Sequence, residues 1–424
     1  MSIFHNIVEV VSDAAYIWRQ EMRQVVRDEG VLIFFIIVPL IYPLLYSWIY
    51  NNEVVHDVPV VIVDDSHSSL SRQFARMCDA SPDVKILCYA ADLDEAQSLV
   101  SRQLAKGIYH IPSEFDRNIN RMEQTAVGVY CDMSLMLTYQ AIYQTAVAVT
   151  STMGARITAS VTRPATKRDA EISARPLAVD DVPVFSPAGG YGSSVLPAVL
   201  MLILQQTLVL GIGLSAGTAR ERNRYHELIP IDRHYQGVFR ILGGKALCYF
   251  MIYCVMGAYL TLVVPRIFSF PQLAQWPHLL AMMLPYTLSC IFFGMIVSCI
   301  VRYRENVMLL MVFVSVPLLF LTGVSWPQTS IPPFWQSISW LFPSTFGVRA
   351  YIRMNTMGAT LGDVIYEYRI LWYQALFYFL VCCMVYRHQI VLSRRHTLDR
   401  LERINRKLAV QEQLKNKVSK KTKH

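Results

Sequence analysis

The stretch VLIFFIIVPLIYPLLYSWIY, residues 31–50, decides the fold class of this chain. It holds no charged residue, and about 20 consecutive apolar residues are what a helix needs to cross the ~30 Å hydrocarbon core of a bilayer. Lipid offers no partner for backbone N–H and C=O groups, so such a segment must be helical. It starts too far into the chain for a signal peptide, is too long, and lacks a small-residue cleavage site. We therefore predict a retained membrane span.

Five more apolar runs follow the first one. Hydrophobic residues make up 54% of the 424 residues and charged residues 17%, which is typical of membrane proteins rather than soluble ones. The last run is short, and the aromatic residues at its start, such as Tyr366 and Trp372, are typical of an interfacial belt. The sequence predicts a polytopic α-helical membrane protein with six transmembrane helices, at 31–50, 195–216, 246–264, 279–301, 307–324 and 370–386.

Charged residues between the runs predict the orientation. The connector 217–245 carries six Lys and Arg against three acidic residues, and the turn after the fourth run carries Arg302 and Arg304. The tail 387–424 has 12 basic and 3 acidic residues, a balance of +9, whereas 51–193 has 12 basic and 17 acidic ones, a balance of −5. Because basic loops stay in the cytoplasm, both termini are predicted to be cytoplasmic, with 51–193 on the other side.

Each cytoplasmic end allows two interpretations. Residues 1–30 have apolar residues at helical spacing, with polar ones such as Asp13, Arg19 and Glu21 between them. They form either an amphipathic interfacial helix on the membrane surface or a helix packed on a partner. The basic tail 387–424 is either an amphipathic helix on anionic lipid headgroups or a solvated anchor. No aromatic residues interleave its charges, which argues against nucleic-acid binding.

The segment 51–193 has the pattern of an α/β domain inserted after the first span. The run VPVVIV, residues 58–63, is a β-branched strand that meets turn chemistry at Asp64, Asp65 and Ser66. Strands alternating with helices predict a small mixed sheet. The expected strands are 58–63, 84–89, 106–111 and 126–131, the expected helices are 70–77, 92–104 and 135–160, and 163–187 is an expected linker back to the membrane.

The sequence contains no recognisable catalytic or metal-binding pattern. Asp64 and Asp65 beside His67 suggest a metal or acid/base cluster, but adjacent strand residues point to opposite faces and no second ligand pair follows. A strand end capped by Asp and Ser is the favoured interpretation. No GxSxG, HExxH or CxxC occurs, and the sequence around Gly244 and Lys245 fails the phosphate-loop motif. We therefore expect no catalytic activity, no metal and no cofactor on this chain.

Three of the nine cysteines, Cys78, Cys88 and Cys131, lie outside the apolar runs. Cys78 and Cys88 could pair in an oxidising compartment, whereas the odd number of outer cysteines disfavours a complete set of disulfides. Both interpretations stay open at this point.

Polar residues inside the spans bear on the source of energy and on the substrate path. None of the six runs has Asp, Glu, Lys or Arg near its middle, which disfavours a proton- or ion-coupled carrier. Gln205, Gln206 and Gln374 are the main mid-membrane polar residues. They either hydrogen-bond between helices or line a substrate path.

Four stretches of this sequence form a pattern that bears on its family. One is Arg27 and Asp28 before a span containing Pro39. The second is the outer pattern with Asp65, Ser69, Ser71, Ile111, Pro112 and Phe115. The third is the connector with Arg220, Glu221, Arg222, Glu227, Pro230, Gly244 and Lys245. The fourth is LTGVSWPQTSIPPFWQSISWLFPSTFGVRAYIRM, residues 321–354, with Gly323, Pro327, Pro332, Pro333, Trp335, Pro343 and Arg349 or Arg353.

Together these four stretches resemble the permease of type-2 ABC exporters, in the branch with a large extracytoplasmic domain between the first and second spans. This resemblance implies a membrane-spanning permease subunit that forms the translocation pathway as a homo- or heterodimer. ATP would be bound and hydrolysed by separate ATP-binding cassette subunits, and a periplasmic adaptor is a further expected partner. The implied location is the cell inner membrane. The implied domains are 1–30, 31–50, 51–193, 194–386 with a coupling segment 217–245 and an outer re-entrant or interfacial segment 325–350, and 387–424.

The resemblance also assigns candidate residues. Coupling to the ATPase falls on Arg220, Glu221, Arg222 and Glu227. The candidates for the translocation path are Gln205, Gln206 and Gln374, which follow from their position in the spans and not from the resemblance. The outer re-entrant segment holds Trp326, Pro327, Pro332, Pro333, Trp335 and Pro343.

Two rival functions stay open. One is a membrane-anchored receptor or assembly factor that binds through its outer domain without transport. The other is a secondary transporter, which would show midplane charges or inverted repeats.

Overall fold

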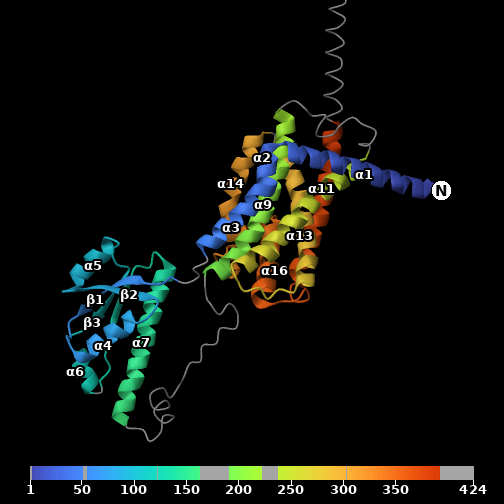
Figure 1. Ribbon diagram of the computed structural model, residues 1–424. Coiled ribbons are helices and arrows are strands. Elements are labelled where there is room, and N and C mark those ends of the chain that lie inside the picture. The colour runs from blue at the N-terminus through green and yellow to red at the C-terminus, as the bar shows by residue number, and fades with distance from the viewer. Residues whose placement is uncertain are drawn as a thin grey trace, which may run out of the picture. The chain divides into compact units, whose positions relative to one another are not determined.

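The computed structural model describes residues 2–50, 55–121, 123–162, 191–221, 237–301 and 303–391 (Figure 1). The chain divides into two compact units. We call residues Met1–Asn51 with Tyr191–His424 the membrane unit, and residues Asn52–Gly190 the α/β domain. Each unit has its own hydrophobic core, so each is described by itself.

Six helices of the membrane unit are long and apolar enough to cross a bilayer, among the residues that the structure describes. All six expected runs are therefore present as helices; the third begins eight residues before its expected start, and the other ends lie within five residues of the expected ones. The first combines α2 (Glu29–Leu32), η1 (Ile33–Ile37) and α3 (Val38–Ile49). The others are α9 (Tyr191–Glu221), α11 (Val238–Ala258) continued by η3 (Tyr259–Val263) and α12 (Val264–Ile267), α13 (Trp276–Ile300), α14 (Arg304–Leu321) and a last helix at Ile365–Val391.

Two of these helices contain a π-helical turn just before a proline. The turn Ile33–Ile37 precedes Pro39, and Tyr259–Val263 precedes Pro265. Proline has no N–H to donate and its ring crowds the carbonyl four residues earlier, so the local hydrogen-bond ladder must widen. The two widened regions touch, because the Tyr259 hydroxyl donates to the Leu40 carbonyl oxygen at 2.9 Å.

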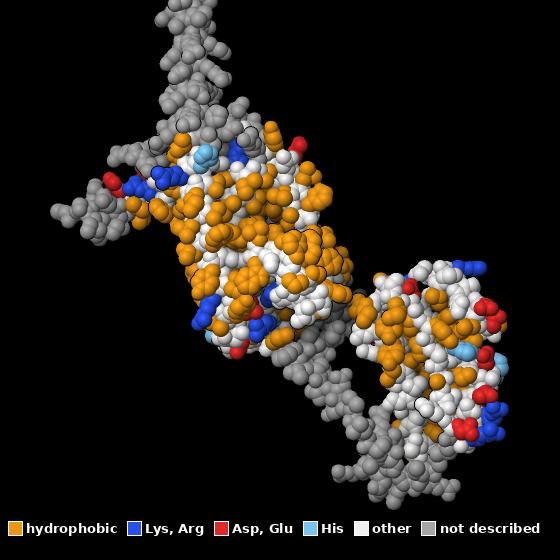
Figure 2. Space-filling view, turned by 180° about the vertical axis from the view of Figure 1, so that it is seen from behind, with side chains coloured by type: hydrophobic (Ala, Val, Ile, Leu, Met, Phe, Trp, Pro, Cys, Tyr) orange, Lys and Arg blue, Asp and Glu red, His pale blue; other side chains and the backbone are white. Residues whose placement is uncertain are grey.

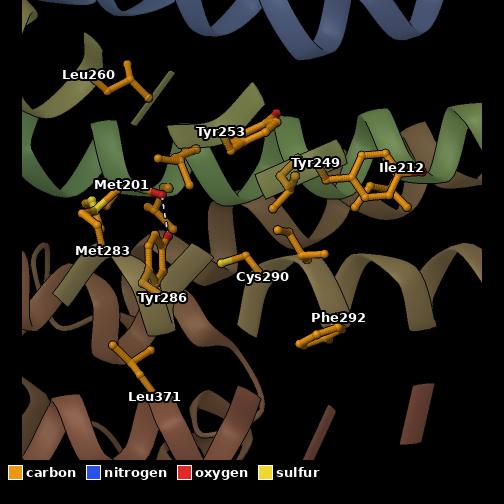
Figure 3. Packing of buried hydrophobic residues seen from close by; sticks show 14 of the residues in the cluster. Met201, Ile212, Tyr249, Tyr253, Leu260, Met283, Tyr286, Cys290, Phe292 and Leu371 are labelled. Carbon is orange, nitrogen blue, oxygen red and sulfur yellow. Dashed lines mark hydrogen bonds between the residues drawn. The ribbon is translucent and has the colours of Figure 1, made fainter. Parts of the chain in front are cut away.

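The core of the membrane unit forms around α9. In the most apolar window of each helix, 78% of α9 is buried, against 28% of the first span and 17% of α14. The hydroxyl of Tyr286 on α13 donates to the Met201 carbonyl of α9 at 2.7 Å, inside a cluster of buried apolar side chains (Figure 3). The outer helices therefore leave wide apolar faces uncovered, and Figure 2 shows hydrophobic side chains over the middle of the membrane unit with charged ones toward its two ends.

The helix α1 (Ser2–Arg27) precedes the first span and packs on α11. The next residue is Asp28, whose Oδ1 accepts from the N–H groups of Gly30 and Val31 and so caps the helix α2. The buried residues of α1 recur every four positions, at Asp13, Ile17, Glu21 and Val25. The sequence pattern separated Asp13 and Glu21 from the apolar face of this helix, but both acids are buried and face α11.

The α/β domain has a four-stranded mixed sheet with strand order β2-β1-β3-β4. β1 (Val58–Asp64) pairs in parallel with both β2 (Val84–Ala90) and β3 (Gly107–Ile111), and β4 (Gly128–Cys131) pairs antiparallel to β3. The mixed sheet expected from the sequence is confirmed. β1 is buried on both faces, which explains its continuous β-branched sequence.

Helices cover the two faces of this sheet. One face packs against α4 (Ser69–Asp79), α6 (Phe115–Asn120) and α7 (Met136–Thr162), through a core that includes Val60, Ile62 and Phe74. The other face packs against α5 (Leu93–Ser101) through a smaller core around Val61 and Val63. The expected linker at 163–187 lies outside the described residues.

The polar cluster at the end of β1 is a turn and cap. Asp64 accepts from the N–H groups of Ser66 and His67 at 3.1 Å and from the Ser71 hydroxyl at 2.7 Å. The neighbouring Asp65 pairs with His110 at 2.9 Å. The interpretation as a capped strand end is confirmed, and within the described ranges no group of three or more His, Cys, Asp or Glu side chains could hold a metal ion.

The outer cysteines are free thiols. Cys78 packs in the core on one face of the sheet, whereas Cys88 contacts the core on the opposite face, so the sheet separates them. Burial raises the pKa of the Cys78 thiol to about 12 and that of Cys131 to about 11. These thiols therefore stay protonated and unreactive near neutral pH.

Candidate functional site

The first functional feature of the membrane unit is a buried ionic junction between α1 and α11, which we call the clamp. It consists of Asp13 and Glu21 on α1 with Arg240, Lys245 and Tyr249 on α11. The Lys245 ammonium lies 2.8 Å from Glu21 Oε2, and the Tyr249 hydroxyl donates to Glu21 Oε1. Arg240 pairs with Asp13 nearer the surface. Two ion pairs therefore join helices that are more than 200 residues apart in sequence.

Close approach of the two backbones makes the clamp possible. A Cβ added at Gly244 would lie 2.8 Å from the Ala14 carbonyl oxygen and from Ile17 Cβ. Any side chain at this position would push α1 away from α11. Gly244 and Lys245 were placed at the end of the connector from the sequence, but they lie inside α11, where the glycine admits α1 and the lysine neutralises Glu21.

The energetics of the clamp follow from its burial. Glu21 and Lys245 are only 3% and 4% exposed, so both ions have left water. Desolvation offsets much of their mutual attraction, and such a pair adds little net stability over an apolar one. Loss of one partner, however, leaves the other charge buried in an apolar site without a counterion, and this is strongly destabilising. The clamp therefore fixes α1 in one position on α11.

The coupling candidates fall on and beyond the end of α9. Arg220 is buried, and its Nη1 donates to the carbonyl oxygens of Ser298 at 2.6 Å and Val301 at 2.7 Å. It thereby caps the C-terminal end of α13, where helix carbonyls lack partners. Glu221 is the last residue of α9. Arg222 and Glu227 lie outside the described residues, so their coupling role stays a prediction.

The three glutamines predicted for the translocation path lie in different surroundings. Gln205 is buried, and its Oε1 accepts from the Ser344 N–H at 2.6 Å in the first turn of α16 (Pro343–Met357). Gln374 is also buried, and its Nε2 donates to the Trp340 carbonyl oxygen at 2.6 Å. The Gln205 amide therefore binds the first turn of α16, and the Gln374 amide binds the backbone just before α16. Gln206 faces a groove.

That groove lies between α3, α9 and α14 and has a volume of about 380 Å³. Tyr42, Tyr46 and Tyr50 of the first span, Gln206 of α9 and Ser315 of α14 supply its polar groups. The rings of Tyr42 and Tyr46 lie 4.9 Å apart, and those of Tyr46 and Tyr50 lie 5.9 Å apart. The rest of the lining is apolar, and none of the described residues that line the groove is charged. Such a surface suits an apolar or aromatic ligand with a few hydrogen-bonding groups.

Sequence reasoning missed the tyrosine row. The signal was available, because residues 42, 46 and 50 are spaced by four and so share one face of a helix. Their neighbours on α9 and α14 come only from the tertiary structure.

The segment predicted to be re-entrant folds as η4 (Gln328–Ser330), α15 (Pro333–Ser339) and α16. Its prolines mark helix starts: Pro327 precedes η4, Pro332 and Pro333 start α15, and Pro343 is the first residue of α16. Trp326 and Trp335 are about half exposed.

The helix α16 is deeply packed rather than superficial. A Cβ added at Gly347 would lie 2.3 Å from the Tyr286 ring, so α16 and α13 approach closely there. Arg349 donates to the Thr322 carbonyl oxygen at 3.2 Å, and Arg353 pairs with Glu367 at 3.0 Å. The helix α16 therefore contacts α13, the end of α14 and the last helix.

Comparisons with known proteins give the family. A comparison with curated proteins found no match. The family model described as "ABC-2 family transporter protein" matches residues 30–383, which include all six candidate spans up to the final turns of the last helix. This match also contains the groove, the α11 side of the clamp and the α/β domain. The chain therefore belongs to the ABC-2 transporter family, as a membrane permease component.

Proposed function

We propose that this chain is the membrane-spanning permease subunit of an ATP-binding cassette exporter, with a translocation pathway formed by two permeases and with ATP bound and hydrolysed on separate subunits. The observation that carries the proposal is the clamp. It ties α1 to the helix that directly follows the charged connector, which is where a cytoplasmic ATPase would engage. The family membership supports the same assignment.

The contacts define a route for the force. A push on the connector reaches α11 at its first residues, and the buried Glu21 and Lys245 pair obliges α1 to move with α11. α1 continues through the Asp28 cap into the first span. The first span carries the tyrosine row of the groove. Movement at the connector would thereby change the width of the groove.

A second permease would complete the pathway. The first span and α14 flank the groove, and both leave most of their apolar surface uncovered. Val312, Phe313 and Val316 on α14 are each at least 60% exposed. Lipid or a second permease must cover such a surface, since exposed apolar area of this size marks membrane or protein contact. Pairing across this face would close the groove into a channel.

The charge pattern supports the orientation. The basic connector and tail support a cytoplasmic location for both termini, with the α/β domain on the opposite side of the membrane, which we propose is the cell inner membrane. A periplasmic adaptor would then bind the α/β domain. Met136, Tyr143 and Val147 form an exposed apolar row on α7 that suits this contact.

The coupling test uses the complex purified from its native membrane. We expect an ATP-binding cassette subunit to copurify in equal stoichiometry, and ATP hydrolysis to require it. The substitution Glu227→Ala should separate ATP hydrolysis from transport, whereas Glu305→Ala, which changes an exposed acid in the first turn of α14, should not. ATP turnover by the chain alone, or unchanged export by Glu227→Ala, would refute the assignment.

Orientation has a separate test. Protease added outside spheroplasts should cleave between residues 51 and 193 and spare the basic tail. Cleavage of the tail from outside would reverse the proposed topology.

A further inference from the structure

A polar cleft lies at the end of the membrane unit that contains α1. It has a volume of about 650 Å³ and is lined by the C-terminal half of α1, the start of α2, the last turns of α9 and the first residue of α14. Arg23 and Arg27 come from α1, and Arg304 comes from α14. The clamp and the tyrosine-lined groove use none of these three arginines.

Among the described residues that line this cleft, positive charge exceeds negative charge. Three guanidinium groups face two carboxylates there, those of Asp28 and Glu29. One oxygen of Asp28 is already occupied by two backbone N–H groups at the start of α2. Arg23 and Arg27 are exposed, so their guanidinium groups are accessible to a ligand. Guanidinium groups bind phosphate through paired, charge-assisted hydrogen bonds.

A glycine lets the third arginine reach the cleft. A Cβ added at Gly30 would lie 1.8 Å from Arg304 Nη2, so the guanidinium lies directly on the glycine backbone. The backbone of Arg304 is also close to Gly217, where an added Cβ would lie 3.0 Å from it. Two glycines therefore position an arginine from α14 against α2 and α9.

Apolar surface continues from the cleft toward the middle of the bilayer. Glu29 lines the cleft, and Ile33 and Ile37 follow it on the same helix face at steps of four residues. These isoleucines are 42% and 39% exposed. A ligand that fits this arrangement has an anionic headgroup at the arginines and hydrocarbon along the first span.

We propose that this cleft binds the phosphate headgroup of an anionic phospholipid from the leaflet at the α1 end, with its acyl chains along Ile33 and Ile37. Basic pockets between helices at the cytoplasmic surface recognise such headgroups. The bound lipid bridges α1, the first span and α14, so it stabilises their junction. This binding does not depend on ATP-driven transport.

The test measures phosphatidylglycerol binding to the detergent-purified full chain by native mass spectrometry. Phosphatidylcholine is the neutral-headgroup control, and glycerol phosphate is the headgroup without acyl chains. We expect phosphatidylglycerol to bind more tightly than phosphatidylcholine. The double substitution Arg23→Gln with Arg27→Gln should weaken binding about tenfold or more, the effect of losing charge-assisted hydrogen bonds.

Two further variants sharpen the result. Arg304→Gln should weaken binding by a similar factor, and if it does not fold, the double variant at exposed positions still decides. Arg19→Gln removes an exposed arginine of α1 that does not line the cleft, and it should bind lipid as the unmodified chain does. Equal binding by the double variant, equal affinity for phosphatidylcholine, or full displacement by glycerol phosphate at lipid-like concentrations would each overturn the proposal.

Discussion

The two ends of the membrane unit are held together by different chemistry. At the α1 end, the buried groups carry full charges: Glu21 with Lys245, and Arg220 on the carbonyl oxygens of α13. At the α16 end, the buried amides of Gln205 and Gln374 hold the backbone around α16. The ion pair at that end, Arg353 with Glu367, has an arginine that is 42% exposed.

This difference makes the two ends unequally sensitive to the loss of a side chain. A buried ion pair fixes one specific partner, because each charge is costly without the other. Neutral amides stabilise a helix start at a smaller cost when lost. The α1 end is therefore the more sensitive of the two to the loss of a single side chain.

The largest expected effect comes from breaking the clamp. Lys245→Met leaves the Glu21 carboxylate buried without its cation and should lower the free energy of unfolding by about 3–5 kcal/mol. Thermal unfolding in detergent measures this change. Adding Glu21→Met to Lys245→Met removes both charges and should restore part of the stability. A double variant less stable than Lys245→Met would contradict the clamp.

The next effect concerns the close approach of α16 and α13. Gly347→Ala forces a methyl group onto the Tyr286 ring, and overpacking of a buried site should cost about 1–3 kcal/mol. Gly243→Ala on α11 is the matched control, because its added methyl group meets no atom within 4 Å. That control should leave stability unchanged or raise it by up to about 1 kcal/mol. Equal melting temperatures for the two variants would contradict the tight packing of α16.

A smaller effect distinguishes two neighbouring glutamines. Gln205→Leu leaves the Ser344 N–H without its acceptor, and should cost about 1–2 kcal/mol of stability. Gln206→Leu should change stability by less than about 0.5 kcal/mol, since Gln206 lines the groove. The expected result for Gln206→Leu is instead altered transport by the assembled complex. Thermal unfolding and transport are measured for both variants side by side. A stability loss in Gln206→Leu, with altered transport in Gln205→Leu alone, would contradict the prediction.

The smallest effect is a pH dependence at the α16 end. Hydrogen bonds from the Thr360 hydroxyl and N–H lower the pKa of the Asp363 carboxyl group. A lowered pKa in the folded state contributes stability above the ordinary aspartate value of about 4, and this stability is lost as the pH falls through the lowered pKa. Asp363→Asn should therefore lose less stability than the unmodified chain between about pH 5 and pH 3. Parallel melting curves across this range would contradict the prediction.

Much of the fold could be predicted because its signals are local. A run such as residues 31–50 has to be helical in lipid wherever it lies, and the β-branched residues 58–63 favour a strand through their own side chains. The prolines of the segment 325–350 likewise start helices through their fixed backbone angle. The candidate site was less predictable. Gln205 and Gln206 have nearly identical sequence context, yet one caps α16 and the other faces the groove.

The sequence by itself determined the six membrane helices, their charge asymmetry and the mixed sheet, because apolar length, net charge and side-chain branching act over short stretches of chain. Only the tertiary structure decided which polar residues face one another. Glu21 and Lys245 are 224 residues apart, and the sequence around either residue does not predict that the two side chains form an ion pair. Neighbouring helix residues differ by about 100° in direction, so their roles depend on which helices pack beside them.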